Sequence, residues 1–218
     1  IRDRLKPAYN VQIAVENYFI VHGYVSNDRT DYNTLIPVLE KHQKAFGSVL
    51  EEMTADSGYC SEKNLLYLKE KGIESYIKLQ DHEKRKTRAY AEDISKYYNM
   101  RVEVFEDEQF YICHDGRELR HIRTETKEQN GYTQTFEVYG CADCSGCEHK
   151  ARCLYKYNAE KDTERNKVMK INEQWDELRE KSHANIQSER GILKRQTRSI
   201  QTEGHFCLLY TSPSPRDA

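Results

Sequence analysis

Long apolar runs are absent from this sequence of 218 residues. No stretch approaches the roughly 18 consecutive apolar residues that a membrane-spanning helix needs. The first residues, Ile1–Arg4, do not resemble a secretory signal peptide. Mean hydropathy is -0.94, and 32% of the residues are charged. We therefore expect a soluble cytoplasmic protein that has no membrane partner.

A strong net charge is also absent, because the formal charge is -2 and the pI is about 6.5. Such a balance gives no general sign of nucleic-acid binding. Basic residues nevertheless gather in residues 150–198, where 13 Lys and Arg stand against 8 Asp and Glu. This excess fits either ordinary charged helix faces or contacts with phosphate, and charge alone slightly favours the first.

Proline is scarce, and two of the four prolines lie in the last twelve residues, 207–218. These twelve residues read as the in-frame translation of a tagmentation sequencing adapter. We therefore expect the natural protein to stop at or near Phe206, the tail to be an artefact, and Leu208–Ala218 to be poorly ordered and dispensable.

A carboxylate stands at the end of one predicted strand, Ser48–Asp56, which leads directly into a helix over Ser61–Lys71. Gly58 permits a sharp turn between them, Ser61 suits the N-cap, and Gly72 suits the position after the helix. Asp56 would thus project from the carboxyl end of a strand, where α/β proteins gather their chemistry. The alternative is that Asp56 only binds backbone amides of the turn.

The first 80 residues predict an α/β arrangement, a mixed sheet covered by helices. Strands Tyr9–Val15 and Tyr18–Val25 should form an antiparallel hairpin, because the gap between them is too short for a crossover. An amphipathic helix is expected over Asp31–Lys44, and a further strand over Ile73–Leu79.

The middle of the chain predicts a β-rich insertion after a polar segment at Gln80–Arg88, which is interpreted as a loop or a frayed boundary. Asn130–Gly131 is a strong hairpin signal between two of its strands. The expected strands are Arg101–Phe105, Gln109–Cys113, Glu118–Thr124 and Tyr132–Tyr139.

Four cysteines fall within 13 residues: Cys141, Cys144, Cys147 and Cys153. In a chain without a secretory signal, such a cluster favours a metal over disulfides. Structural zinc ranks first, an iron–sulfur cluster second, and plain reduced thiols third. Cys60 and Cys113 are interpreted as ordinary buried thiols.

The sequence from Glu164 onward is predicted to be helical. Apolar residues recur there at helical spacing, as a stripe that would pack against the sheet. Residues 188–191 interrupt this pattern, and a last helix is expected from Ile192 to Glu203. The stripe consists of Val168, Ile171, Trp175 and Leu178.

Three stretches, in this order, resemble the DDE transposases of bacterial insertion sequences: Lys6–Gln12, Ala55–Tyr59 and Arg198–Phe206. The resemblance implies a ribonuclease H-like fold in which two Asp and one Glu hold two Mg²⁺ or Mn²⁺ ions. It implies that Asp56 and Glu203 are metal ligands and catalytic residues. It also implies an Arg ahead of that Glu that contacts DNA, which is Arg198, with Arg195 as the alternative.

The resemblance further implies DNA as the partner, both transposon ends and target, with a homodimer as a further expected assembly. It places the protein at the nucleoid of a bacterial cell. Relatives often carry a cysteine cluster in the inserted segment, which supports a structural zinc. The expected division is a partial catalytic core over 1–80, the insertion over 81–158, C-terminal helices over 159–206, and the tail over 207–218.

Two features of the family pattern are missing from this sequence. The remaining Asp should precede the hairpin, and the Lys expected at position 210 is replaced by Tyr210. We therefore expect a fragment that lacks both ends and is inactive as it stands. Two other readings remain: a catalytically dead DNA-binding remnant, and a zinc-stabilised interaction module in which Asp56 and Glu203 are only surface acids.

Overall fold

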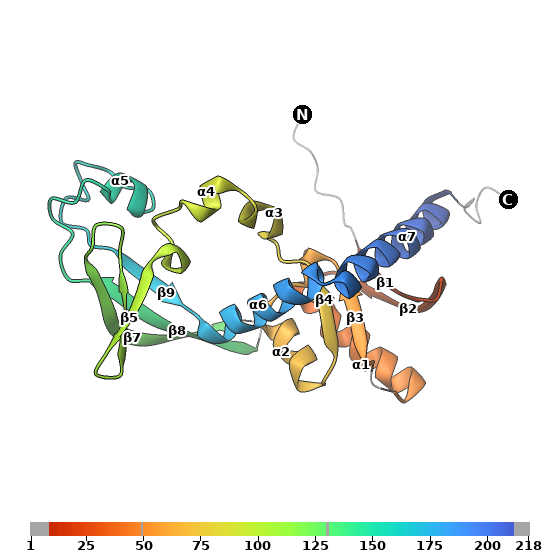
Figure 1. The fold of residues 1–218 in the computed structure, drawn as a ribbon. Helices are drawn as coiled ribbons and strands as arrows, with labels where there is room; N and C mark the ends of the chain where they lie inside the picture. Colours follow the sequence, from red (N-terminus) through yellow and green to blue (C-terminus); the bar gives the residue numbers. More distant parts are fainter. Residues whose placement is uncertain (1–8, 49, 130, 212–218) are drawn as a thin grey trace. The chain divides into compact units, whose positions relative to one another are not determined.

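The computed structural model describes residues 9–48, 50–129 and 131–211 (Figure 1). They form two compact units, and unit 1 contains the residues up to Gln80 together with those from Glu177 onward. Unit 2 is Asp81–Asp176. The insertion expected at 81–158 is thus a compact unit that extends further along the chain.

Unit 1 begins with an antiparallel hairpin of strands β1 (Asn10–Glu16) and β2 (Phe19–Ser26), as the sequence predicts. Asn17 and Tyr18 turn the chain with φ angles of 47° and 68°. Val11 is exposed, whereas Gln12 is buried and only 7% exposed. The buried side chain of Gln12 donates hydrogen bonds to Asn10 Oδ1 at 2.7 Å and to Asp31 Oδ1 at 2.9 Å.

A parallel pair of strands follows the hairpin in unit 1, β3 (Glu52–Ala55) beside β4 (Glu74–Ile77). Ser61 caps the helix between them, and its side chain accepts a hydrogen bond from the Asn64 amide, as predicted. Gly72 follows that helix with a φ of 69°. The other elements here are η1 (Asp31–Asn33), α1 (Leu35–Phe46), η2 (Ser57–Tyr59) and α2 (Glu62–Glu70).

Two C-terminal helices, α6 (Glu173–Gln187) and α7 (Glu189–Thr211), complete unit 1. The first residues of α6 belong to unit 2. Ser182 of α6 donates a hydrogen bond to the Ile77 carbonyl at 2.7 Å, which fixes α6 to β4. Helix α7 packs against β1, β3 and β4 (Figure 1). Leu68, Ile77 and Ile186 are almost fully buried in this unit.

The expectation of mixed helices and sheets is confirmed, but the described strands of unit 1 do not form one mixed sheet. The β1–β2 hairpin and the β3–β4 pair are separate two-stranded sheets in hydrogen-bonding terms. The ribonuclease H-like core stays a prediction.

Glu52 of β3 joins the first part of the chain to α7. Its carboxylate accepts hydrogen bonds from Lys194 and, at 2.7 Å, from Arg190. The hydrogen bond from Lys194, followed by that from Arg190, lowers the pKa of Glu52 below its ordinary value of 4.5. These ion pairs therefore stabilise unit 1 above about pH 4.5, and the contribution is lost as pH falls through the folded pKa.

We expect Glu52→Gln to lower the free energy of unfolding at neutral pH and to make it less sensitive to acid below pH 4.5. Urea unfolding at a series of pH values, followed by hydrogen exchange in α7, measures this effect. Glu51→Gln is the matched control, because it removes the same charge from an exposed neighbour. Equal pH profiles for the two variants would contradict the expected role of Glu52.

Unit 2 is built on one antiparallel sheet of five strands in the order β5–β6–β7–β8–β9. Gly131 has a φ of 66° between β7 and β8, where the sequence predicts a hairpin; Asn130 lies outside the described residues. The strands are β5 (Arg101–Phe105), β6 (Glu108–Ile112), β7 (Glu118–Gln129), β8 (Tyr132–Cys141) and β9 (Val168–Ile171).

The helix expected to begin at Glu164 is wrong at its start, because Val168–Ile171 forms strand β9. Met169 and Ile171 are buried while Val168 and Lys170 are exposed, which is the alternation of a strand. The strand pairs with the edge of β8, from Glu137↔Ile171 to Gly140↔Val168. Unit 2 therefore extends to Asp176.

The segment Gln80–Arg88 lies at the boundary between the two units, as one of its two interpretations expected, but the loop is wrong. Two short helices lie there, α3 (His82–Arg85) and α4 (Arg88–Ala91). The interleaved charges pair at helical spacing, Arg85 with Asp81 at 3.5 Å and Lys86 with Glu83 at 3.1 Å. Two further short elements of unit 2 are η3 (Tyr97–Asn99) and α5 (Lys150–Cys153).

The last helix is longer than the sequence predicts. The interruption after α6 is reduced to Ser188, and α7 continues through Thr211. The backbone is thus helical at 207–211, where we expected a poorly ordered tail; residues 212–218 lie outside the described part. No helix among the described residues combines the length and apolar character of a bilayer span.

Candidate functional site

Asp56 lies where β3 ends and η2 begins, in unit 1. Its Oδ1 accepts a hydrogen bond from the Ser57 amide at 2.6 Å, so the interpretation as a turn cap is confirmed for this oxygen. The Asp56 side chain is nevertheless 60% exposed. Its other oxygen therefore remains available to a cation.

Arg198 of α7 is the cation nearest to that oxygen. Its Nη2 lies 3.9 Å from Asp56 Oδ2, and its side chain is 30% exposed. An exposed pair at this distance contributes little to stability. The packing of α7 against β3 therefore positions the guanidinium beside the carboxylate.

Glu203 and Arg195 have different surroundings from those of Arg198. Glu203 is exposed and accepts a hydrogen bond from Ser199 Oγ at 2.8 Å. It follows Arg198 by five positions, which is about 140° around a helix. Arg195 Nε is buried without a hydrogen-bond partner among the described residues. Of the two candidate arginines, the structure brings only Arg198 to Asp56.

Among the described residues, no three His, Cys, Asp or Glu side chains converge in a way that could hold a metal ion. The roles of Asp56 and Glu203 as ligands thus stay predictions. The donor chemistry still fits a hard cation such as Mg²⁺, because the Asp56 carboxylate lies at an exposed strand end.

Asp31 supports the Asp56 turn from the other side, a role that the sequence analysis missed. Its Oδ1 accepts hydrogen bonds from Asn10 Nδ2 at 2.8 Å and from Gln12 Nε2 at 2.9 Å. Its Oδ2 lies where a Cβ on Gly58 would come within 2.6 Å. Asp31 therefore joins strand β1 to the turn that carries Asp56, and Gly58 leaves room for its carboxylate.

Tyr59 and Asn64 extend this network. Burial, followed by the nearby Asp31 carboxylate, raises the pKa of the Tyr59 phenol above its ordinary value, so the phenol stays protonated at neutral pH. Asn64 donates to the carbonyls of Tyr32 at 3.0 Å and Tyr59 at 2.9 Å. Since Asn64 is itself almost fully buried, these bonds hold η1 and η2 together on helix α2.

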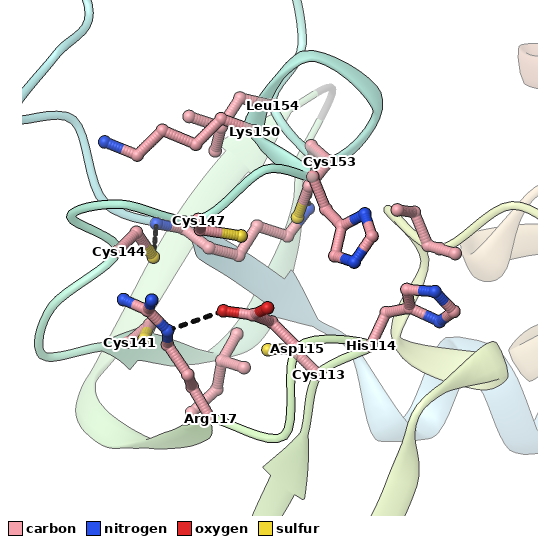
Figure 2. A pocket seen from close by; sticks show the side chains of 14 residues that line it. Cys113, His114, Asp115, Arg117, Cys141, Cys144, Cys147, Lys150, Cys153 and Leu154 are labelled. Atoms are coloured by element: carbon pink, nitrogen blue, oxygen red, sulfur yellow. Dashed lines mark hydrogen bonds and ion pairs between the residues drawn. The ribbon is translucent and has the colours of Figure 1, made fainter.

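The predicted cysteine cluster lines a pocket in unit 2 (Figure 2). Cys141 and Cys144 are each 8% exposed, and Cys153 is half-buried. The interpretation of Cys113 as an ordinary buried thiol is wrong, because this half-buried residue lines the same pocket. Cys60 is buried in unit 1, as expected.

Three thiols of this pocket, those of Cys141, Cys147 and Cys153, have a raised pKa. Burial, together with the hydrogen bond to Cys144, raises the pKa of Cys141 to about 11. Burial also raises the pKa of Cys147 and of Cys153. Zinc binding by any of these residues would therefore have to displace protons from sulfur.

Residues 112–215 match the family model described as a transposase DDE domain. The match begins in β6 and includes the cysteine pocket, Arg198 and Glu203, but it does not reach Asp56. It spans a little under half of the chain. No curated protein and no solved structure matches.

Proposed function

We propose that the chain is part of an enzyme that cleaves DNA strands and transfers them during insertion-sequence transposition, because residues 112–215 match the family model of a transposase DDE domain. Its partners would be the transposon ends and the target DNA. The protein would work at the nucleoid in the cytoplasm, and a homodimer would allow two transposon ends to be held together.

In unit 1 this proposal rests on the placement of Arg198 beside Asp56. Arg198 lies within the residues that match the family model, whereas Asp56 lies before them in the sequence. Asp56 would bind a divalent ion through the oxygen that faces Arg198. Glu203 would supply a second carboxylate from the same helix. Mg²⁺ or Mn²⁺ in such a site activates the attacking oxygen and stabilises the leaving one.

Arg198 has two roles in this proposal. Without metal, its guanidinium partly neutralises Asp56 at 3.9 Å. A guanidinium can also bind two oxygens of one phosphate, so Arg198 would turn to the DNA backbone when a cation takes its place. Arg195, one turn earlier on α7, would contribute a second phosphate contact.

This chain alone would not cut DNA. Position 210 carries Tyr210 where the family pattern has Lys, and a third carboxylate has no candidate among the described residues. Asp31 is unsuited to that role, because Asn10 and Gln12 already occupy one of its oxygens and the other faces Gly58. We propose that the missing Asp belongs to a strand that precedes the hairpin.

The test is metal binding by the chain as it exists. We expect Mn²⁺ to bind near Asp56, as seen by enhanced water-proton relaxation, and Asp56→Asn to abolish this binding. Mg²⁺ at ten times its Kd should raise the free energy of unfolding by about 1.4 kcal/mol. That corresponds to an increase in Tm of about 3 °C for a chain of this size.

Glu40→Gln is the control, because it removes an exposed carboxylate of α1 in the same unit. It should leave Mn²⁺ binding unchanged. Equal Mn²⁺ binding by the wild type and Asp56→Asn would overturn the proposed metal site. If the chain binds DNA through the basic segment 150–198 but binds no metal, the DNA-binding remnant is the better description.

A further inference from the structure

The pocket of unit 2 brings together five thiols, one more than a tetrahedral zinc site needs (Figure 2). Four of them come from the predicted cluster at 141–153. The fifth, Cys113, comes from the turn between β6 and β7. The geometry of the pocket decides which four suit a metal.

Cys113 is held in position by its own turn. Its amide donates to the Arg117 carbonyl at 2.9 Å, and its carbonyl accepts from the Gly116 amide at 2.9 Å. The residue packs against the same buried cluster that contains Cys141, Cys144 and Leu119. Leu119 in turn pairs with Cys141 across strands β7 and β8. The sheet therefore fixes three thiols, those of Cys113, Cys141 and Cys144, on one small core.

Cys147 is engaged elsewhere. Its thiol lies beside the carboxylate of Asp115. Arg117 Nε binds the same carboxylate at 2.8 Å, as the dashed line in Figure 2 shows. Arg117 also donates to the carbonyls of Asp143 at 2.8 Å and Ser145 at 2.9 Å. Asp115 and Arg117 thus hold the 143–147 loop with the Cys147 thiol directed to a carboxylate.

Lys167 supplies the positive groups that a cluster of thiolates requires. Its backbone amide donates to Cys144 Sγ at 3.4 Å, and its ammonium lies against the Cys153 carbonyl at 3.2 Å. The Lys167 ammonium also donates to the Ser95 carbonyl at 2.7 Å. Four thiolates exceed the charge of one divalent ion, so a nearby amide and ammonium would stabilise the loaded site.

We propose that this pocket binds one divalent metal ion of the zinc type through Cys113, Cys141, Cys144 and Cys153, while Asp115 holds Cys147 outside the coordination sphere. No three of these described side chains lie where they could hold an ion without moving, so binding would rotate the four sulfurs to about 2.3 Å from the ion. The ion ties the β6–β7 turn to the end of β8 and to helix α5. Its role is structural and independent of the proposed catalytic site in unit 1.

Cobalt is the probe, because Co²⁺ bound by thiolates has intense charge-transfer and d–d absorption. The full chain, reduced and freed of metal, should bind about one Co²⁺ with the spectrum of four thiolates, and Zn²⁺ should displace it. Cys113→Ser should lose that spectrum and bind Co²⁺ about a hundredfold more weakly, since losing a ligand costs at least as much as losing an outer partner.

Cys147→Ser is the matched variant from the same pocket, and Cys60→Ser is a control from unit 1. Both should keep the tetrathiolate spectrum. Alkylation of the zinc-loaded wild type gives a measurement without mutation: Cys147 should react first, and the other four thiols of the pocket only after chelation.

Three results would overturn the proposal. The first is loss of cobalt by Cys147→Ser with retention by Cys113→Ser, which would restore the set Cys141, Cys144, Cys147 and Cys153. The second is a reduced wild-type chain that binds neither Co²⁺ nor Zn²⁺. The third is iron and sulfide in protein purified without oxygen, which would make the site an iron–sulfur centre.

Discussion

Gly191→Ala is expected to destabilise unit 1 by about 3 kcal/mol, because a methyl group at this position overlaps backbone. A Cβ there would lie 2.0 Å from the Asn185 carbonyl oxygen and 2.8 Å from the Ile186 Cα. Gly191 is buried where the first turn of α7 lies on the last turn of α6. No side-chain rotation can relieve a clash with backbone, so α7 itself has to move.

The expected shift of α7 also separates Arg198 from Asp56 and Lys194 from Glu52. Hydrogen exchange measured by mass spectrometry detects this shift of α7. Amides in α7 and β3 should exchange faster, whereas the exchange rates of amides in unit 2 should stay unchanged. Gly204→Ala is the control on the same helix, because an added Cβ there would meet no atom within 4 Å. That change should stabilise α7 by about 0.5–1 kcal/mol.

If Gly191→Ala and Gly204→Ala had the same effect on exchange, the close contact between α6 and α7 would be incorrect.

The second large effect is expected at Gly58. Alanine there would place a Cβ 2.6 Å from Asp31 Oδ2, and Asp31 cannot retreat without losing the hydrogen bonds from Asn10 and Gln12. We expect Gly58→Ala to cost about 2 kcal/mol and to weaken Mn²⁺ binding at Asp56, because the turn that carries Asp56 would be displaced.

A double-mutant cycle separates this clash from a general effect of alanine in the turn. In an Asp31→Ala background, the methyl group of Gly58→Ala has room, so the two changes should couple by at least about 1 kcal/mol. Additive effects would remove the proposed contact. Gly23→Ala is the control, since its Cβ would meet no atom within 4 Å in strand β2 of the same unit.

Local signals in the sequence predicted the parts of the fold that depend on neighbouring residues. The two-residue turn after β1, the Ser61 cap and the stop at Gly72 each rest on contacts within about one turn of the chain. The same holds for Asp56, whose cap on Ser57 is a contact between adjacent residues. These features form wherever such short patterns occur.

Parts that depend on distant partners were wrong or missed. Val168 and Ile171 are three positions apart, which fits a helix, and only the free edge of β8 makes this segment a strand. Cys113 joins the cysteine pocket because the register of β6, β7 and β8 brings its turn back to Cys141. Asp31 was predicted only as the first residue of a helix, since its partners Asn10 and Gln12 lie about twenty residues earlier.

The interrupted course of unit 1 bears on the order in which the chain folds. Strand β3 precedes unit 2 in the sequence, whereas helix α7, which packs against it, follows unit 2. During synthesis, strands β1 to β4 therefore leave the ribosome before α7 has been made. Until then, the surfaces that pack against α7 stay uncovered. Unit 2, which is continuous, can fold in the meantime and shorten the flexible loop that separates the two halves. Because closing a loop costs more entropy as it lengthens, by about 0.6 kcal/mol per doubling, prior folding of unit 2 would speed completion of unit 1.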